Sequence, residues 1–68
     1  MTEKEYYLYI GKIIKEKRKE FGYTQLEFCK ILNIDRSYYS KIEKGTVNFT
    51  MSKLIKILHS LNLNLKIF

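Results

Sequence analysis

Residues that start and stop helices alternate along this sequence, and this alternation limits the chain to short helices. Thr and Asp cap helix N-termini, while Gly and Asn accept the left-handed backbone on which many helices end. The starts are Thr2, Thr24, Asp35 and Thr50, and the stops are Gly22, Asn33, Gly45 and Asn62. Glu5 and Glu27 each follow a Thr by three positions, as in a capping box. The pattern predicts four helices, over about residues 3–21, 25–32, 36–44 and 51–61.

Residues three and four positions apart form one core-facing stripe on each predicted helix. The stripes are Tyr6, Ile10, Ile14, Arg18 and Phe21; Phe28, Cys29 and Leu32; Tyr39 and Ile42; and Met51, Leu54, Ile55, Leu58 and Leu61. Other apolar residues of the first two predicted helices lie off these stripes, among them Tyr7, Tyr9, Ile13, Leu26 and Ile31. They either pack against the first turns of the first helix or bind another protein, and the sequence favours neither.

The hydrophobic period changes at the C-terminus. Leu63, Leu65 and Ile67 alternate with other residues, and Phe68 ends the chain. Alternation of period two is typical of a β-strand. A single strand leaves its backbone groups unpaired, so we expect residues 63–68 to pair with the same strand of a second copy across a two-fold axis. The alternative is a frayed terminus, which would expose much apolar surface.

The composition indicates one small domain over residues 1–68 with an anionic partner. Thirteen cations against seven anions give a net charge of +6, which favours nucleic acid first and an anionic membrane surface second. The apolar runs are too short to span a membrane, and the N-terminus does not resemble a signal peptide. We therefore expect a cytoplasmic protein.

The residue types argue against an enzyme or a metalloprotein. Cys29 is the single cysteine and His59 the single histidine, so neither a disulfide nor a zinc site is expected. The sequence contains no nucleophile–base set, no paired carboxylates in an apolar setting and no phosphate-binding glycine loop. We expect no cofactor and no metal.

Only Asn33 and Ile34 lie between the second predicted helix and Asp35, the cap of the third, which is a helix-turn-helix arrangement. From Ile10 to Leu63 the sequence resembles the Cro/C1-type (XRE) family. The stretches that carry the resemblance are GYTQLEFCKILNIDRSYYSKIEKG and MSKLIKIL. The resemblance implies an all-α, lambda repressor-like domain of four helices that binds double-stranded DNA. With the C-terminal strand, it implies a homodimer on a palindromic operator.

The resemblance also assigns roles to individual residues. It implies that the outer face of the third helix reads base edges through Arg36, Ser37, Ser40 and Lys41. It implies DNA phosphate contacts by Thr24, Gln25, Tyr38, Lys44, Thr46, Asn48 and Thr50. Arg18 and Glu43 match an internal ion pair of the family, Cys29 takes a small packing position, and Tyr39 takes a core position. The alternative for the outer face is an ordinary solvated helix.

The C-terminal sequence KLIKILHSLNLNLKIF resembles the end of HipB-like antitoxins. That resemblance implies a repressor of its own operon that binds a HipA-type serine/threonine kinase toxin. A stand-alone phage-type or restriction-modification regulator is the alternative. A third possibility is an interaction module that has lost DNA binding, but Arg36, Lys41 and Gln25 argue against it.

Overall fold

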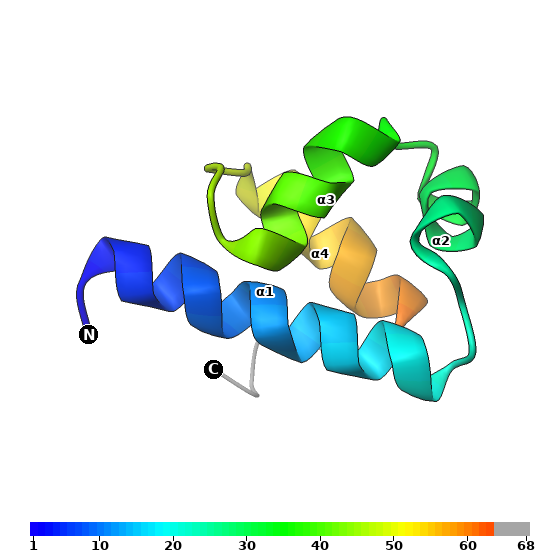
Figure 1. Ribbon diagram of the computed structural model, residues 1–68, viewed down its shortest axis with the longest axis horizontal. Coiled ribbons are helices and arrows are strands. Elements are labelled where there is room, and N and C mark those ends of the chain that lie inside the picture. Colours follow the sequence, from blue (N-terminus) through cyan, green and yellow to red (C-terminus); the bar gives the residue numbers. More distant parts are fainter. Residues whose placement is uncertain (64–68) are drawn as a thin grey trace.

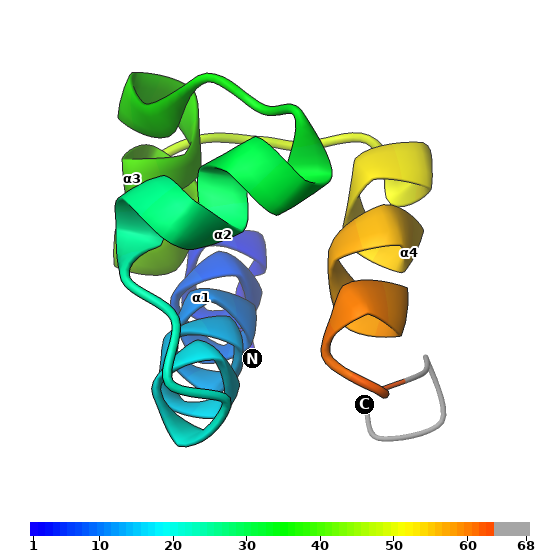
Figure 2. The same cartoon turned by 90° about the vertical axis from the view of Figure 1, so that its right-hand side faces the viewer.

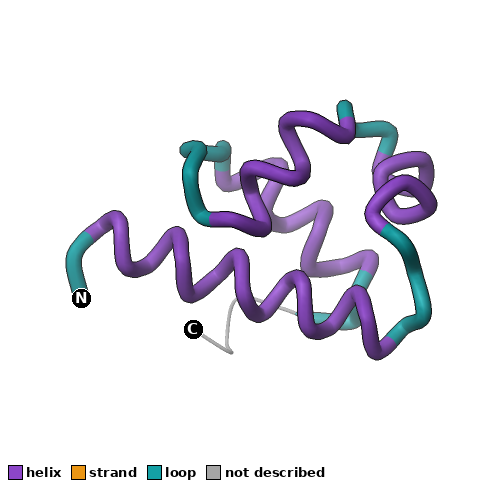
Figure 3. The backbone as a smooth tube through the Cα atoms, in the orientation of Figure 1, coloured by secondary structure: helices purple, strands orange, loops and turns teal. Residues whose placement is uncertain are grey.

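The chain forms four helices connected by short loops (Figure 1). The computed structural model describes residues 1–63. Its helices are α1 (Glu3–Glu20), α2 (Gln25–Leu32), α3 (Arg36–Lys44) and α4 (Met51–Ser60). Helix α1 runs along one side of the molecule, and α3 and α2 lie across it (Figures 1 and 2). Within residues 1–63 there is no strand (Figure 3), so the predicted all-α fold is confirmed for the part described.

Each helix begins at the capping residue that the sequence predicts. Thr2 and Thr24 form complete capping boxes with Glu5 and Glu27, in which each hydroxyl accepts from the Glu N–H and each Thr N–H donates to the carboxylate. The Asp35 carboxylate accepts from the N–H of Tyr38. The Thr50 hydroxyl accepts from the N–H of Lys53 in the same way. The four starts are therefore fixed by local hydrogen bonds.

Each helix also ends in the same way, at a residue with positive φ. These residues are Gly22, Asn33, Gly45 and Asn62. After each of them the next N–H donates to a carbonyl five residues back; for example, the Leu63 N–H bonds to the Leu58 carbonyl at 2.8 Å. This is the Schellman arrangement. Leu63 thus closes α4 and is not in a strand here, while the rest of the predicted dimer strand, residues 64–68, lies outside the described residues.

The core lies among the four helices, and each helix contributes to it. The buried apolar residues are Ile14, Phe28, Cys29, Leu32, Tyr39, Ile42, Leu54, Ile57, Leu58 and Leu61. Ile57 is fully buried although the predicted stripe omitted it, because α4 packs through residues 54, 57, 58 and 61. Ile55 lies beside that stripe and is half-buried.

Three residues predicted to face the core are exposed: Tyr6 at 50%, Phe21 at 39% and Met51 at 59%. Phe21 is the residue after the last turn of α1. Tyr6 and Met51 line a shallow apolar hollow between the first turns of α1 and α4. In place of Tyr6, Tyr7 turns inward and meets Phe49 edge to face, with ring centroids 5.1 Å apart.

The remaining off-stripe residues divide in two. Ile13 is half-buried. Tyr9, Leu26 and Ile31 expose 42%, 48% and 53% of their surface. Of these five off-stripe residues, only Tyr7 and Ile13 fit the interpretation that these residues pack inside the domain. The other three lie at the surface.

Helix α1 approaches α3 closely at two glycines. A Cβ at Gly11 would lie 2.5 Å from the carbonyl oxygen of Ile42 and 2.7 Å from that of Glu43. A Cβ at Gly45 would lie 2.7 Å from Cα of Leu8. The absence of side chains at these two positions sets how near the C-terminal half of α3 sits to α1.

Candidate nucleic-acid interface

Helices α2 and α3 form a two-helix unit with a tight turn. Asn33 adopts the left-handed conformation (φ 55°), Ile34 is half-buried against the core, and Asp35 caps α3. Figure 2 shows α2 lying across the end of α3 that follows this turn. The first residues of α3 after this turn, Arg36 and Ser37, lie at the surface.

Helix α3 has two chemically different sides. Tyr39, Ile42 and Glu43 are buried. The opposite side carries the four predicted base-reading residues: Arg36, Ser37 and Lys41 are exposed and Ser40 is half-buried. One side of the helix is therefore anchored while the other offers donors and two cations to a partner.

The predicted phosphate-binding residues Thr24 and Gln25 lie at the N-terminus of α2. The Thr24 hydroxyl already accepts from the Glu27 N–H at 3.1 Å. Within residues 1–63, the N–H groups of Gln25 and Leu26 have no hydrogen-bond partner. A helix N-terminus with unpaired N–H groups favours an anion, so the backbone at this end is suited to a phosphate.

A buried ion pair joins α1 to α3. Arg18 Nε donates to Glu43 Oε2 at 2.7 Å, and Arg18 Nη2 donates to Oε1 at 3.2 Å. Arg18 Nη1 donates to the Tyr23 carbonyl, which lies in the loop before α2. The Gln25 amide nitrogen also donates to Glu43 Oε1, at 3.0 Å. The pair therefore connects α1, α2 and α3.

The charges in this network determine its titration. Burial opposes ionisation of Glu43, but hydrogen bonding to its carboxylate, first of all from Arg18, outweighs burial and lowers the pKa of the Glu43 carboxyl. The hydrogen bond to Glu43 in turn raises the pKa of Arg18. Both groups are therefore charged in the folded protein at neutral pH.

Tyr39 places a hydroxyl inside the core. Within the described residues, this oxygen is the one buried side-chain polar atom without a hydrogen bond of good geometry. Burial, together with the negative charge of Glu43, raises the pKa of Tyr39. Its ring packs edge to face against Phe28, with centroids 5.6 Å apart.

The loop between α3 and α4 carries the other predicted phosphate contacts. Lys44, Thr46, Asn48 and Thr50 are all exposed. Tyr38 lies against this loop: its hydroxyl donates to the Asn48 carbonyl at 3.2 Å, and Lys53 Nζ lies 5.2 Å from the centre of its ring. Tyr38 is half-buried and its hydroxyl is engaged in holding the loop.

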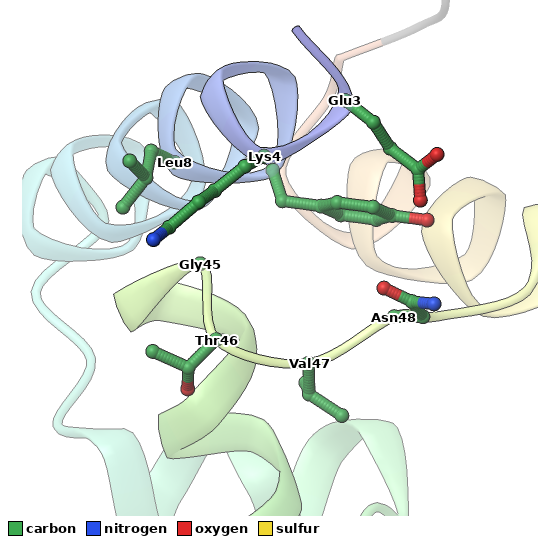
Figure 4. A pocket seen from close by; sticks show the side chains of 8 residues that line it. Glu3, Lys4, Leu8, Gly45, Thr46, Val47 and Asn48 are labelled. Carbon is green, nitrogen blue, oxygen red and sulfur yellow. The ribbon is translucent and has the colours of Figure 1, made fainter.

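The first turns of α1 support the same loop from the other side. Lys4 and Leu8 of α1 and Gly45 and Thr46 of the loop are among the residues that line one hollow (Figure 4). Its volume is about 600 Å³. The Thr46 hydroxyl donates to the Lys41 carbonyl at 3.4 Å. Contacts from α1 and α3 thus fix the loop beside the outer face of α3.

Two features of this region escaped sequence reasoning. Nothing local marks Gly11 as a contact point, because its partner carbonyls are about thirty residues away. The Gln25–Glu43 hydrogen bond likewise joins residues 18 positions apart. Gln25 is drawn toward the interior by this bond, which the predicted phosphate role alone does not suggest.

The residues with enzymatic or metal-binding potential are isolated. Cys29 is buried, and burial raises the pKa of its thiol. His59 is exposed on α4. Within residues 1–63, no three His, Cys, Asp or Glu residues come together as a metal site, and no helix is long and apolar enough to cross a membrane.

Helix α3 is buried on one side and polar and cationic on the other, and a tight turn joins it to α2. This arrangement defines a helix-turn-helix module. The helix-turn-helix family model matches residues 14–68, and the chain belongs to this family of XRE-type DNA-binding regulators. Members of the family are generally not enzymes.

Two regulators resemble the chain over most of its length. The ImmF control region 10 kDa protein of Bacillus phage phi105 is 38% identical over 58 residues, which are 85% of this chain and 64% of that protein. Antitoxin PezA of Streptococcus pneumoniae serotype 4 is 45% identical over 49 residues, which are 72% of this chain and 30% of that protein. The chain thus spans less than two thirds of either relative. No solved structure matches it.

Proposed function

We propose that this protein is a sequence-specific transcriptional repressor that reads DNA with the outer face of α3. The observation that supports this most is the division of α3 into a buried side and a side bearing Arg36, Ser37, Ser40 and Lys41. Arg36 is suited to guanine, whose O6 and N7 accept two hydrogen bonds from one guanidinium. Lys41 reaches a guanine or a phosphate, and the serines bond to several bases.

Phosphate contacts on either side of α3 hold the protein in register on the DNA. The proposed contacts are Thr24, Gln25, Tyr38, Lys44, Thr46, Asn48 and Thr50. The hydroxyls of Thr24 and Thr50 each accept an N–H at the helix N-terminus that they cap, which leaves the hydroxyl hydrogen to donate to a phosphate. The net charge of +6 adds attraction that depends on salt.

The repressor acts as a homodimer in the cytoplasm. Residues 64–68, with Leu65, Ile67 and Phe68 as the apolar positions, are the proposed dimer contact, because Leu63 closes α4 and packs against the core. Two copies related by a two-fold axis present two α3 helices to a palindromic operator. Its half-site centres are then about 10 bp apart, or a multiple of this.

Selection from a library of random duplexes tests the function. We expect an enriched palindrome whose affinity for the protein falls as salt concentration rises. Binding that does not discriminate between the selected duplex and a shuffled one would contradict sequence-specific reading. Lys56→Ala provides a control, because Lys56 is an exposed cation on α4 and is not among the proposed DNA contacts.

A second function, that of an antitoxin, is favoured by the resemblance to antitoxin PezA. In this form of the proposal the protein represses its own operon and also binds a toxin. The HipB-like C-terminal sequence suggests a HipA-type kinase as that toxin. The phage relative supports the alternative of a stand-alone regulator.

The neighbouring gene distinguishes the two forms. A kinase-like reading frame whose product is toxic alone, and harmless when co-expressed with this protein, would support the antitoxin. Co-purification of the two chains gives the physical test. A regulator that binds its operator with no toxic neighbour would support the stand-alone form.

A further inference from the structure

Glu43 receives donors from two other parts of the protein. It is buried on α3, with only 7% of its surface exposed. One of its oxygens accepts from Arg18 Nε, and the other accepts from both Arg18 Nη2 and Gln25 Nε2. Gln25 is the first residue of α2. The carboxylate on the reading helix therefore contacts the side chain that the proposed function assigns to a DNA phosphate.

A carboxylate without a proton accepts hydrogen bonds and donates none. Glu43 must therefore hold the nitrogen, and not the oxygen, of the Gln25 amide on its own side. A primary amide has two hydrogens on that nitrogen. One is used by Glu43, and within residues 1–63 the other has no hydrogen-bond partner. The side chain is half-buried, which restricts the other orientations open to it.

We propose that Glu43, itself held by Arg18, is a positioning residue for DNA binding: it orients the Gln25 amide so that the second N–H is offered to a phosphate. This inference rests on the proposed DNA-binding function. The alternative orientation would offer the amide oxygen, which repels a phosphate. Because α3 carries both Glu43 and the base-reading residues, the same bond fixes the distance between one phosphate contact and the bases being read.

The ion pair can be removed without changing the net charge. Arg18→Met with Glu43→Leu deletes one cation and one anion, and replacement of a buried pair by apolar residues often preserves the fold. Lys17→Met with Glu20→Leu is a matched control, because this exposed pair on the same helix has an N–O distance of 3.4 Å. Each double variant is then combined with Gln25→Met, which removes the amide and keeps the length of the side chain.

Affinity for the selected duplex and for a shuffled duplex is measured for all six proteins. Gln25→Met should weaken binding to both duplexes by a similar factor, on the order of tenfold. The Arg18/Glu43 variant should weaken binding by several-fold, and adding Gln25→Met to it should cause little further loss. On the control background, Gln25→Met should keep its full effect.

Additive losses on the Arg18/Glu43 background would overturn the positioning role, since a purely structural pair leaves the Gln25 contact independent. A Gln25→Met variant of unchanged affinity would also overturn it, while leaving specific binding by α3 intact. Failure of the unmodified protein to bind any duplex would instead contradict the proposed function itself.

The unmodified protein offers a second measurement, which does not depend on the variants folding. Its Gln25 side-chain amide should give two distinct NMR signals, of which the hydrogen bonded to Glu43 exchanges slowly with water. Adding the selected duplex should shift the signal of the other hydrogen. Two rapidly exchanging signals that do not respond to DNA would contradict the inference.

Discussion

Gly11 lies directly against the carbonyl oxygen of Ile42, so that α1 and α3 meet backbone to backbone. A Cβ at residue 11 would come within 2.5 Å of that oxygen and 3.0 Å of the carbonyl carbon of Glu43. Both neighbouring atoms belong to the backbone of a packed helix. The clash is therefore relieved only if α3 moves away from α1.

We expect Gly11→Ala to destabilise the protein by about 1–3 kcal/mol, as overpacking does. In an open helix the same change would stabilise it by about 1 kcal/mol, because alanine is the better helix former. Urea unfolding measures the difference. Gly22→Ala is the comparison, because residue 22 has φ +80° and open space around it. This substitution should lower the free energy of unfolding by about 1–2 kcal/mol from backbone conformation alone. A stabilised Gly11→Ala protein would show that the helices are not in contact there.

Arg36→Ala should weaken binding to the selected operator by about 1–3 kcal/mol and relax the preference at one base pair of each half-site. The reason is the loss of a two-bond contact with one base. Competition between operators substituted at each position measures this. Lys44→Ala, at a proposed phosphate contact, should instead weaken all sequences about equally and reduce the dependence on salt. Unchanged base preference in Arg36→Ala would remove Arg36 from the reading face.

The stability of the protein should fall in acid because of Glu43. The pKa of this carboxyl is lowered in the folded state, and an unfolded glutamate titrates near about pH 4.3. The stabilisation that the ionised Glu43 gives to the folded protein is therefore fully present above that pH, and it is lost as the pH falls through the lower pKa of the folded state. Urea unfolding between about pH 2 and pH 7 measures it. The Arg18→Met, Glu43→Leu protein should lose less stability in acid than the Lys17→Met, Glu20→Leu control, and equal losses would contradict this assignment.

The neighbouring residues Tyr38 and Tyr39 should respond oppositely to loss of the hydroxyl. Tyr39→Phe removes a buried oxygen without a well-formed hydrogen bond, so we expect unchanged or higher stability, by up to about 1 kcal/mol. Tyr38→Phe removes the bond to the Asn48 carbonyl and should cost roughly 0.5–1.5 kcal/mol. Thermal unfolding of the two proteins measures both. Marked destabilisation by Tyr39→Phe would reveal a bond from that hydroxyl.

Tyr39 also gives an alkaline test. Burial raises the pKa of Tyr39, so folding disfavours its ionised form, and stability is lost as the pH rises past the unfolded value of about 10. Tyr39→Phe should reduce this loss. An unaltered alkaline profile in Tyr39→Phe would contradict a buried, neutral Tyr39.

Removal of residues 64–68 should produce a monomer and weaken operator binding, if these residues form the proposed dimer contact. The deletion should start after Leu63, because Leu63 closes α4 and packs against the core. Light scattering measures the mass, and thermal unfolding shows whether the domain is intact. A dimer that survives the deletion would place the interface on other residues.

The ends of the helices could be predicted from the sequence, because caps and stops act through neighbours in the chain. Thr24 and Asn33 cap the two ends of α2, and Asp35 and Gly45 cap the two ends of α3, as the sequence pattern predicts. The burial of individual residues was predicted less well. Tyr6 and Met51 have the right spacing for the core but lie where no other helix covers them. The helical period predicts which side of a helix faces inward, while the length and position of the neighbouring helices decide how much of that side is buried.

The candidate interface shows the same division. The outward position of Arg36 and Lys41 follows from helical spacing once Tyr39 and Ile42 are assigned to the core. The direction of the Gln25 amide does not follow, because it depends on the meeting of three helices around Glu43. Contacts between distant residues are the part that local patterns cannot supply.

The way the four helices end has a consequence for how such a protein changes over time. Caps, left-handed stops and buried residues account for the fold, and the outward residues 36, 37, 40 and 41 take no part in them. Substitution at these four positions is therefore nearly free of folding cost. In the proposed repressor, mutation can therefore explore new operators one residue at a time, and a duplicated copy can acquire its own target while both copies keep the same scaffold.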